Sequence, residues 1–382
     1  MLILAASLAL FVYGVIAAML GTLMPTFQLT DAQNGTVALA QAIGLVIASV
    51  SVGPLIDKRG KKVALLLGLT LIAIALFTLP HVTADYRLLM AFFLLLGVGG
   101  GIVVTGANML ASDVSDARRA SVLNVLNLFF GLGGFATPFI MAHLLGGDPV
   151  RLCYLAAVLT VVTLLVNAAT KMPAPRPAAT GATAEEGAVY SRPVLYLLAL
   201  FLFLYIACEV GVWNWLNKYL VGRGVPAASA LNILSFGFAL GLLFGRLVVS
   251  RILIKVSSLN VTLASAILMA ATTYLMLRTS DPKIAWIAVF CAGLAMAPVF
   301  PTALAIVGDV FRLRTATAMG FVITCGWIGL AVSSPIIGSI AGRASLGTAL
   351  LILPAFSVAM IVVNLAIRPL VGEKRLAADE RR

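Results

Sequence analysis

Twelve continuous apolar runs constrain what this chain can fold into more than any other feature. A hydrocarbon core of about 30 Å, crossed at a rise of about 1.5 Å per residue, needs roughly 20 apolar residues in a helix. Runs of about that length occupy residues 2–24, 34–56, 62–81, 86–110, 119–145, 150–170, 193–220, 226–253, 258–279, 284–308, 315–342 and 346–370. Because the runs do not alternate between apolar and polar residues, they favour transmembrane helices over the strands of a barrel.

The composition requires the same surroundings. Of the 382 residues, 62% are apolar and 10% are charged, and the mean hydropathy is +1.09. A soluble domain is nearer half apolar and a quarter charged, so lipid has to solvate the excess apolar surface. We therefore predict an all-α polytopic protein in a lipid bilayer. The cysteines lie inside the apolar runs without metal-ligand spacing, as small buried hydrophobic residues do. They are Cys153, Cys208, Cys291 and Cys325.

The net charge of +12 reflects membrane orientation and does not predict a nucleic-acid partner. If both termini are cytoplasmic, nineteen of the 26 Lys and Arg residues fall on the inner side. The other seven are Arg87, Arg151, Lys218, Arg223, Arg278, Lys283 and Arg343. Short loops rich in cations stay on the cytoplasmic side. The bias predicts a multi-pass protein of a cell membrane, here the bacterial inner membrane, with both termini in the cytoplasm.

A linker divides the twelve runs into six and six. The segment 172–192 contains three prolines and the acidic pair Glu185–Glu186, a composition typical of a mobile linker. We predict a six-helix bundle over residues 1–171, a cytoplasmic linker over 172–192, a second bundle over 193–371 and a cytoplasmic tail over 372–382.

The two halves also repeat each other. Asp113 and Arg118 match Asp309 and Arg314 at a displacement of 196 residues, and Pro138 and Pro335 match at 197. Gly97 and Gly293 match at 196, and Gly14 and Gly211 at 197. A displacement that stays constant to within one residue indicates a duplicated six-helix unit. Parallel repeats of this kind occur in transporters whose halves rock about a central site.

The loop after the second run carries a family resemblance. Residues 53–62 read GPLIDKRGKK, which is similar to the G-x-L-a-D-r-x-G-r-k loop of the major facilitator superfamily. The resemblance implies two pseudo-symmetric bundles around a central cavity, and a gating role for Asp57, Arg59 and Gly60. A generic basic turn is the alternative. The second copy departs from the pattern, because Ile254 stands where the aspartate would be.

Further gating residues are expected at the cytoplasmic helix ends. Arg118 and Arg314 occupy equivalent junctions, where salt bridges with Asp57, Asp113 or Asp309 would close the inner side. Arg246 lies about a turn inside its run from Arg251, where we expect a structural pair with Asp309. Solvated anchoring of these cations is the alternative.

A finer resemblance indicates the substrate class. Residues 209–219 (EVGVWNWLNKY), 245–246 and 300–302 (FPT) resemble the fucose–proton symporter group, which also contains glucose and galactose permeases. The resemblance implies a sugar or sugar-like substrate. One departure concerns proton coupling: proton-coupled members carry acidic residues in helices 1 and 4, and this chain has no carboxylate within the membrane in either run.

Glu209 is the one acidic residue well inside an apolar run. A carboxylate in the membrane is costly and usually faces a cavity or a partner. Glu209 is therefore the candidate proton carrier. The alternatives are a neutral, hydrogen-bonded structural acid and a charge paired with Lys218.

Aromatic and amide side chains suit a neutral polyol, because ring faces stack on the sugar and amides bond its hydroxyls. The candidate substrate-binding residues are Tyr13, Gln41, Asn108, Asn124, Asn127, Trp213, Asn214 and Trp327. Asn124 and Asn127 share a polar stripe with Gly131 and Gly134, at helical spacing. The alternatives are close helix packing for the stripe and interfacial anchoring for Trp213 and Trp215.

The sequence thus predicts a monomeric carrier of a small polar solute that works by alternating access. It shows no nucleotide-binding loop, metal cluster or nucleophile–base arrangement, so we expect no cofactor and no enzyme activity. Two alternatives stay open: drug or metabolite efflux, and a non-transporting sensor on a transporter scaffold.

Overall fold

A computed structural model describes residues 1–112, 119–172, 189–252, 256–279, 281–311 and 315–379. All the regular structure that these residues form is helical. Twelve helical spans are long and apolar enough to cross a membrane. The prediction of twelve spans is confirmed, and each span overlaps the run that predicted it.

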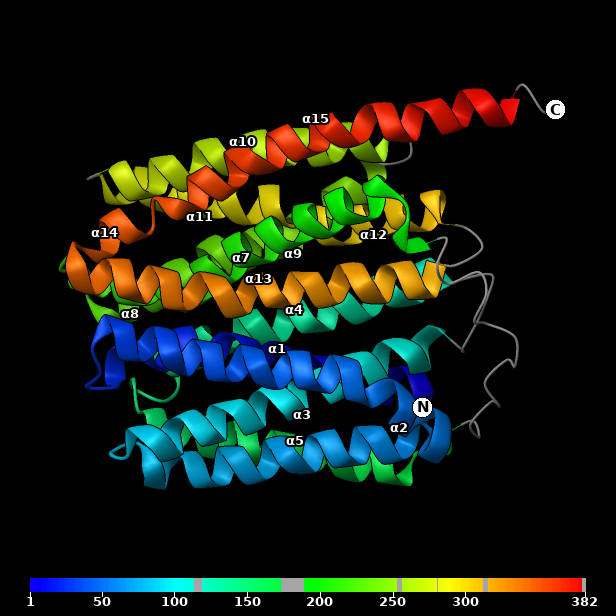
Figure 1. Ribbon diagram of the computed structural model, residues 1–382. Helices are drawn as coiled ribbons and strands as arrows, with labels where there is room; N and C mark the ends of the chain where they lie inside the picture. The colour runs from blue at the N-terminus through cyan, green and yellow to red at the C-terminus, as the bar shows by residue number, and fades with distance from the viewer. Residues whose placement is uncertain (113–118, 173–188, 253–255, 280, 312–314, 380–382) are drawn as a thin grey trace.

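The helices of both halves lie side by side with their axes roughly aligned (Figure 1). The N-terminal half contains α1 (Leu2–Leu23), the short η1 (Met24–Thr26), α2 (Asp31–Val82), α3 (Tyr86–Ser112), α4 (Arg119–His143) and α5 (Pro149–Ala169). The C-terminal half contains α7 (Pro193–Gly222), α8 (Ala227–Asn232), the π-helix η2 (Ile233–Ala239), α9 (Leu240–Ile252), α10 (Ser258–Arg278), α11 (Pro282–Met296), α12 (Val299–Val310), α13 (Thr315–Arg343), α14 (Leu346–Ala349) and α15 (Ile352–Asp379).

The helices depart from one run per helix at several places. Helix α2 contains two spans, and Gly60 reverses the chain between them with φ 85° and ψ 162°, a conformation that favours glycine. The tenth span breaks between α11 and α12, where Pro298 cannot continue the hydrogen-bond ladder. The eighth span contains the π-helix η2. Such bulges are frequent at functional sites, and no feature of the apolar pattern predicted this one.

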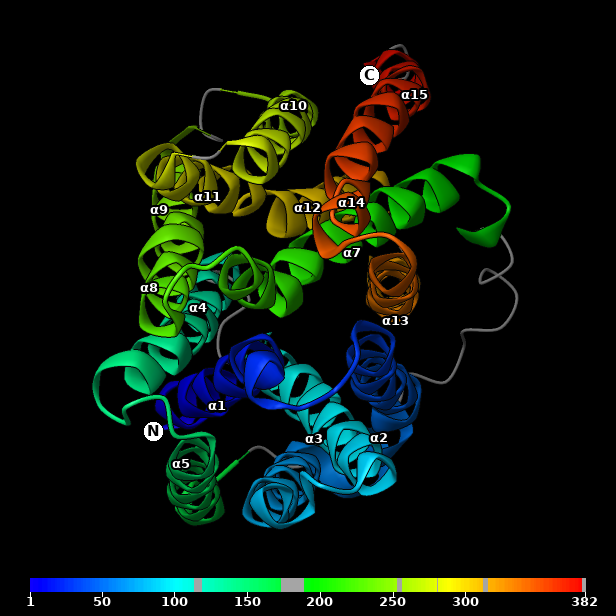
Figure 2. The same cartoon turned by 90° about the vertical axis from the view of Figure 1, so that its left-hand side faces the viewer.

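The outward faces of the bundle are apolar. Viewed along the helices, α5, α10 and α15 lie at its periphery and α1, α7 and α13 toward its middle (Figure 2). Large hydrophobic side chains on the outside are strongly exposed, including Leu165 at 63%, Ile287 at 64% and Val362 at 63%. Bare apolar surface of this extent suits lipid contact and explains the excess of apolar residues.

Glycine crossings reveal the internal repeat in three dimensions. A Cβ atom on Gly97 would lie 2.0 Å from the Gln41 carbonyl oxygen, where α3 crosses α2 beside Gly44. In the other half, a Cβ atom on Gly293 would lie 2.2 Å from the Phe238 carbonyl oxygen, beside Gly241. Only glycine lets two backbones approach this closely. The equivalent crossings confirm the fold of two pseudo-symmetric six-helix bundles.

The start of α1 and the end of α15 lie at the same end of the molecule, which we call the terminal end; the opposite end is the distal end (Figure 1). At the distal end α2 and α13 touch, since a Cβ atom on Gly35 would lie 2.8 Å from the Ser334 carbonyl oxygen. A Cβ atom on Gly338 would likewise lie 2.5 Å from the Asp31 carbonyl oxygen.

At the terminal end the same two helices are apart. Gly53 and Gly320 each lie eighteen residues, about five helical turns, from Gly35 and Gly338 and therefore on the same helix faces. A Cβ atom on either would meet nothing within 4 Å. Helices α2 and α13 thus diverge toward the terminal end.

Candidate functional site

Glu209 lies where the two halves meet. Its helix α7 packs against α1 of the N-terminal half. Tyr205 and Trp213, one turn before and one turn after it on α7, lie close enough to interact with its carboxylate, which the Arg246 guanidinium attracts. The Glu209 side chain is half-buried, so part of it stays accessible. These contacts replace the expected alternative of a pair with Lys218.

Arg246 joins the halves directly. Its Nη1 donates a hydrogen bond to the Asn127 carbonyl oxygen of α4, over 2.5 Å, and its guanidinium lies 5.8 Å from the centre of the Phe130 ring. Arg246 therefore belongs to the same cluster as Glu209. The expected pair with Asp309 is not what the structure contains: Asp309 is exposed on α12, and Arg246 makes its contacts with α4 and Glu209.

Aromatic rings surround the charged pair. Tyr13 of α1 stacks on Phe130 at a centroid distance of 5.3 Å and lies close enough to Glu209 to sense its charge. Trp213 meets Phe238 of the π-helix edge-on at 5.1 Å. The glycine stripe of α4 makes room for these groups, since a Cβ atom on Gly134 would lie 3.1 Å from the Trp213 ring.

The surroundings of the two neighbouring tryptophans of α7 are those of core residues. Trp213 is 6% exposed and Trp215 is fully buried. Neither ring reaches a lipid surface, so the alternative of interfacial anchoring is wrong for both. Trp215 Nε1 has no hydrogen-bond partner, whereas Trp213 lies close enough to Glu209 to interact with its carboxylate.

Other predicted substrate residues lie in helix contacts. Gln41 donates to the Ile16 carbonyl oxygen at 3.4 Å, and Asn108 donates to the Val104 carbonyl oxygen of its own helix at 2.8 Å. Asn214 is buried and donates to Ser334 Oγ at 3.3 Å, so its amide serves the packing of α7 on α13. Trp327 is half-buried on α13 and packs against the core. Asn214 is therefore not part of the proposed site.

The predicted gate residues are described in part. Gly60 turns the chain with φ 85°, and Arg59 is exposed beside it. The side chains of Asp57 and Asn124 are outside what the structure describes, as are Arg118 and Arg314 in full. Their roles stay predictions.

The described contacts that close the bundle lie at the distal end. Lys218 Nζ of α7 forms an ion pair with Asp31 Oδ1 of α2 at 2.7 Å, and both side chains are about a quarter exposed. Asn217 donates to the carbonyl oxygens of Gly21 and Thr22, both at 3.2 Å. His143 Nε2 lies 2.6 Å from Asn232 Oδ1. Each contact joins one half to the other.

Three residues of the cluster were missed at the level of sequence. Tyr205 lies four residues before Glu209, and the helical spacing that identified Trp213 would have found it. Phe130 follows Asn127 by three residues on the same stripe. Phe238 had no signal, because only the packing of η2 brings it to Trp213.

Comparison with known proteins identifies the family. The model of the Major Facilitator Superfamily matches residues 2–256 and 226–381, which together span nearly the whole chain. This chain belongs to the Major Facilitator Superfamily. It is a multi-pass membrane protein of that family.

Sugar permeases are among its relatives, which confirms the predicted resemblance. The glucose/mannose transporter GlcP of Bacillus subtilis is 23% identical over 396 residues, covering 97% of this chain and 96% of GlcP. A structure of the E. coli fucose:proton symporter FucP superposes with a TM-score of 0.68 at 19% identity, covering 96% of this chain and 98% of FucP. The nucleoside transporter NupG gives a TM-score of 0.76 at 15% identity, with 96% and 98% covered. At these identities the two structures show a shared fold.

Proposed function

We propose that this protein carries a sugar or a sugar-like polar solute across the membrane by alternating access. The observation that carries the proposal is the Glu209–Arg246 cluster, which draws residues from α1, α4, α7, η2 and α9 and so lies between the two halves. A solute bound there would touch both halves. Rocking of the halves would then expose it first to one side of the membrane and then to the other.

The chemistry of the cluster suits a neutral polyol. The negative charge of Glu209 is balanced by Arg246, so the site as a whole does not demand a charged solute. Tyr13 and Trp213 offer ring faces for the apolar side of a sugar, and Glu209, Arg246 and Asn127 offer donors and acceptors for its hydroxyls. The sugar named for GlcP and the ribose of a nucleoside share this chemistry.

The arrangement of the helices corresponds to one state of the cycle. The Lys218–Asp31 ion pair and the Gly35–Gly338 contact close the distal end, whereas Gly53 and Gly320 lie apart at the terminal end. In this proposal the terminal end faces the cytoplasm, because it carries most of the cations. The described state then opens inward.

Glu209 is the proposed site of proton coupling. A proton on its carboxylate would remove its attraction for Arg246, which also holds the Asn127 carbonyl oxygen of the other half. Protonation would thereby change a contact between the halves, which is the link that coupled transport requires.

A ligand screen tests the substrate class. Purified protein is heated with glucose, fucose, a nucleoside, an amino acid or a quinolone, since a ligand that binds the native state raises the melting temperature. We expect a rise with at least one sugar or nucleoside and a smaller rise in Trp213→Ala. A rise with the quinolone alone would favour efflux, and binding without flux in liposomes would favour a sensor.

A further inference from the structure

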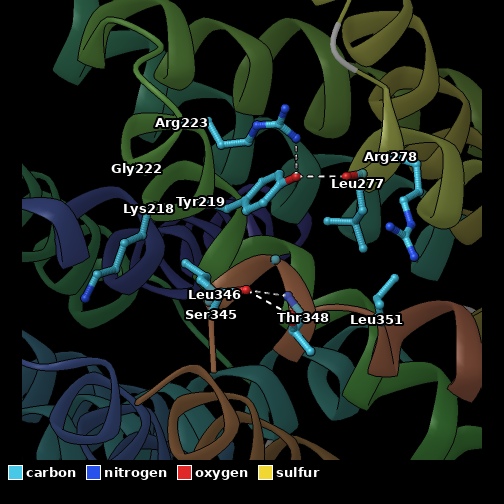
Figure 3. Close-up of a pocket in the computed structure, with 11 residues that line it drawn as sticks. Lys218, Tyr219, Gly222, Arg223, Leu277, Arg278, Ser345, Leu346, Thr348 and Leu351 are labelled. Carbon is cyan, nitrogen blue, oxygen red and sulfur yellow. Dashed lines mark hydrogen bonds between the residues drawn. The ribbon is translucent and has the colours of Figure 1, made fainter. Parts of the chain in front are cut away.

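A cavity lies at the distal end of the C-terminal half, away from the Glu209–Arg246 cluster. It has a volume of about 660 Å³ and lies between the end of α7, the end of α10 and the start of α14. Its lining contains the cations Lys218, Arg223 and Arg278, the hydroxyl groups of Tyr219, Ser345 and Thr348, and three leucines. Figure 3 shows these side chains.

Two of the cations have no acidic partner in the described part of the chain. Arg223 donates to Tyr219 Oη at 3.0 Å, and its guanidinium lies 5.8 Å from that ring centre. The guanidinium of Arg278 lies 5.7 Å from the centre of the Tyr274 ring. Lys218 differs, because its ammonium points away from them (Figure 3) and forms the ion pair with Asp31. The cavity therefore has a positive wall made by Arg223 and Arg278.

This concentration of charge opposes the general bias of the chain. Only seven of the 26 Lys and Arg residues belong to the distal end, yet three of them line this one cavity. Arginines at that end are not needed for orientation, and two guanidinium groups that line one cavity without an acidic partner attract an anion.

We propose that this cavity binds a phosphate group. Arginine forks match phosphate oxygens. Ser345 and Thr348 share a hydrogen bond between their hydroxyl groups at 2.9 Å, which leaves one of the two hydroxyl protons to donate to the same ligand. The cavity also lies where three spans end, and the ends of membrane spans lie near the membrane surface. Leu277, Leu346 and Leu351 give one side of it an apolar character. The phosphate can belong to an anionic lipid headgroup or to a free anion.

The test uses the full chain, purified in a neutral detergent. Binding of phosphatidylglycerol is titrated by native mass spectrometry, with phosphatidylcholine as reference, and binding of inorganic phosphate is followed by the melting temperature. We expect Arg223→Gln/Arg278→Gln to weaken binding by on the order of tenfold or more, because each cation near a headgroup contributes to its attraction. The matched control, Arg87→Gln/Arg151→Gln, removes the same charge from the distal end of the other half and should bind as the wild type does.

A second variant does not alter the arginines. A Cβ atom on Gly222 meets nothing within 4 Å, so this lining position accepts a side chain. Gly222→Glu should repel the phosphate and reduce binding, whereas Gly222→Gln should not. Binding of phosphatidylglycerol alone identifies the lipid as the source, and binding of inorganic phosphate identifies a free anion. Binding of neither, or equal loss in the arginine variant and its control, overturns the proposal.

Discussion

Replacing Gly338 by valine is expected to open the distal end of the bundle. A Cβ atom at this position would lie 2.5 Å from the Asp31 carbonyl oxygen and 3.2 Å from the Gly35 Cα atom. Ordinary contacts between such atoms are at least about 3.4 Å, so α2 and α13 would have to separate by about 1 Å. Because both close neighbours are backbone atoms, no side chain can rotate to relieve the clash.

The size of the effect follows from the cost of overpacking. Added methyl groups in a well-packed contact cost about 1–3 kcal/mol. That cost falls on the state with a closed distal end and not on the state in which α2 and α13 are apart there. The ratio of the two populations should therefore move by about 5- to 150-fold toward the open distal end.

Gly320→Val is the matched control on the same helix. A Cβ atom there meets nothing within 4 Å, so the described state tolerates the valine. If the terminal ends of α2 and α13 approach each other in the rest of the cycle, this valine should oppose that approach and favour the described state. Both variants change glycine to valine within α13, so differences in helix propensity cancel.

Spin labels on Thr83→Cys and Ala344→Cys, two exposed distal positions in different halves, report the separation. The label pair is placed in a background without the native cysteines and measured by double electron–electron resonance. We expect a longer distance to gain population in Gly338→Val and the short distance to persist in Gly320→Val. Equal distance distributions in the two folded variants would refute the reasoning.

Three further predictions concern the gate, the crossings and the site. Asp31→Lys and Lys218→Asp should each destabilise the closed distal end by about 1 kcal/mol, as expected for a partly exposed ion pair. The double variant with exchanged charges should restore the short distance between the labels, and failure to restore it would argue against the ion pair. Gly97→Val and Gly293→Val should both lower the melting temperature, since a Cβ atom would lie 2.0 Å and 2.2 Å from a carbonyl oxygen, while Gly53→Val should not; a similar loss in all three would contradict the equivalent crossings. Trp213→Ala should weaken sugar affinity, measured by isothermal titration calorimetry, by on the order of tenfold through the lost ring face. Trp286 is 42% exposed on the outside, and Trp286→Ala should leave the affinity unchanged in the same measurement.

The sequence predicted the features that depend on local pattern. Span length follows from the thickness of the bilayer, so all twelve spans were found, and the turn at Gly60 follows from the loop that needs a positive φ. The repeat could be predicted because the same close helix crossing requires a glycine in each half, Gly97 in one and Gly293 in the other. Each of these signals can be read from a few turns of one helix or from one constant spacing between the two halves of the sequence.

The site was predicted only in part, because it depends on contacts between helices far apart in the chain. Glu209 and Trp213 were found through the cost of a buried charge and the spacing of one helix. The placement of Arg246 was wrong, since distance along its helix suggested the cytoplasmic end, whereas the packing of α9 on α4 brings it to the Asn127 carbonyl oxygen. Asn214 was indistinguishable in sequence from a substrate-binding amide, and the structure uses it to join α7 to α13.

Transport by proteoliposomes that contain Glu209→Gln provides the decisive measurement. Vesicles that contain the wild-type protein or the variant are prepared with a sugar identified in the ligand screen. Labelled sugar is then followed in two assays, exchange and uphill uptake driven by a proton gradient. We predict that both proteins exchange the sugar, and that only the wild type accumulates it against its gradient. Absence of sugar flux in wild-type vesicles would contradict transport through the Glu209–Arg246 cluster, and undiminished uphill uptake in the variant would contradict the role of Glu209 as the proton carrier.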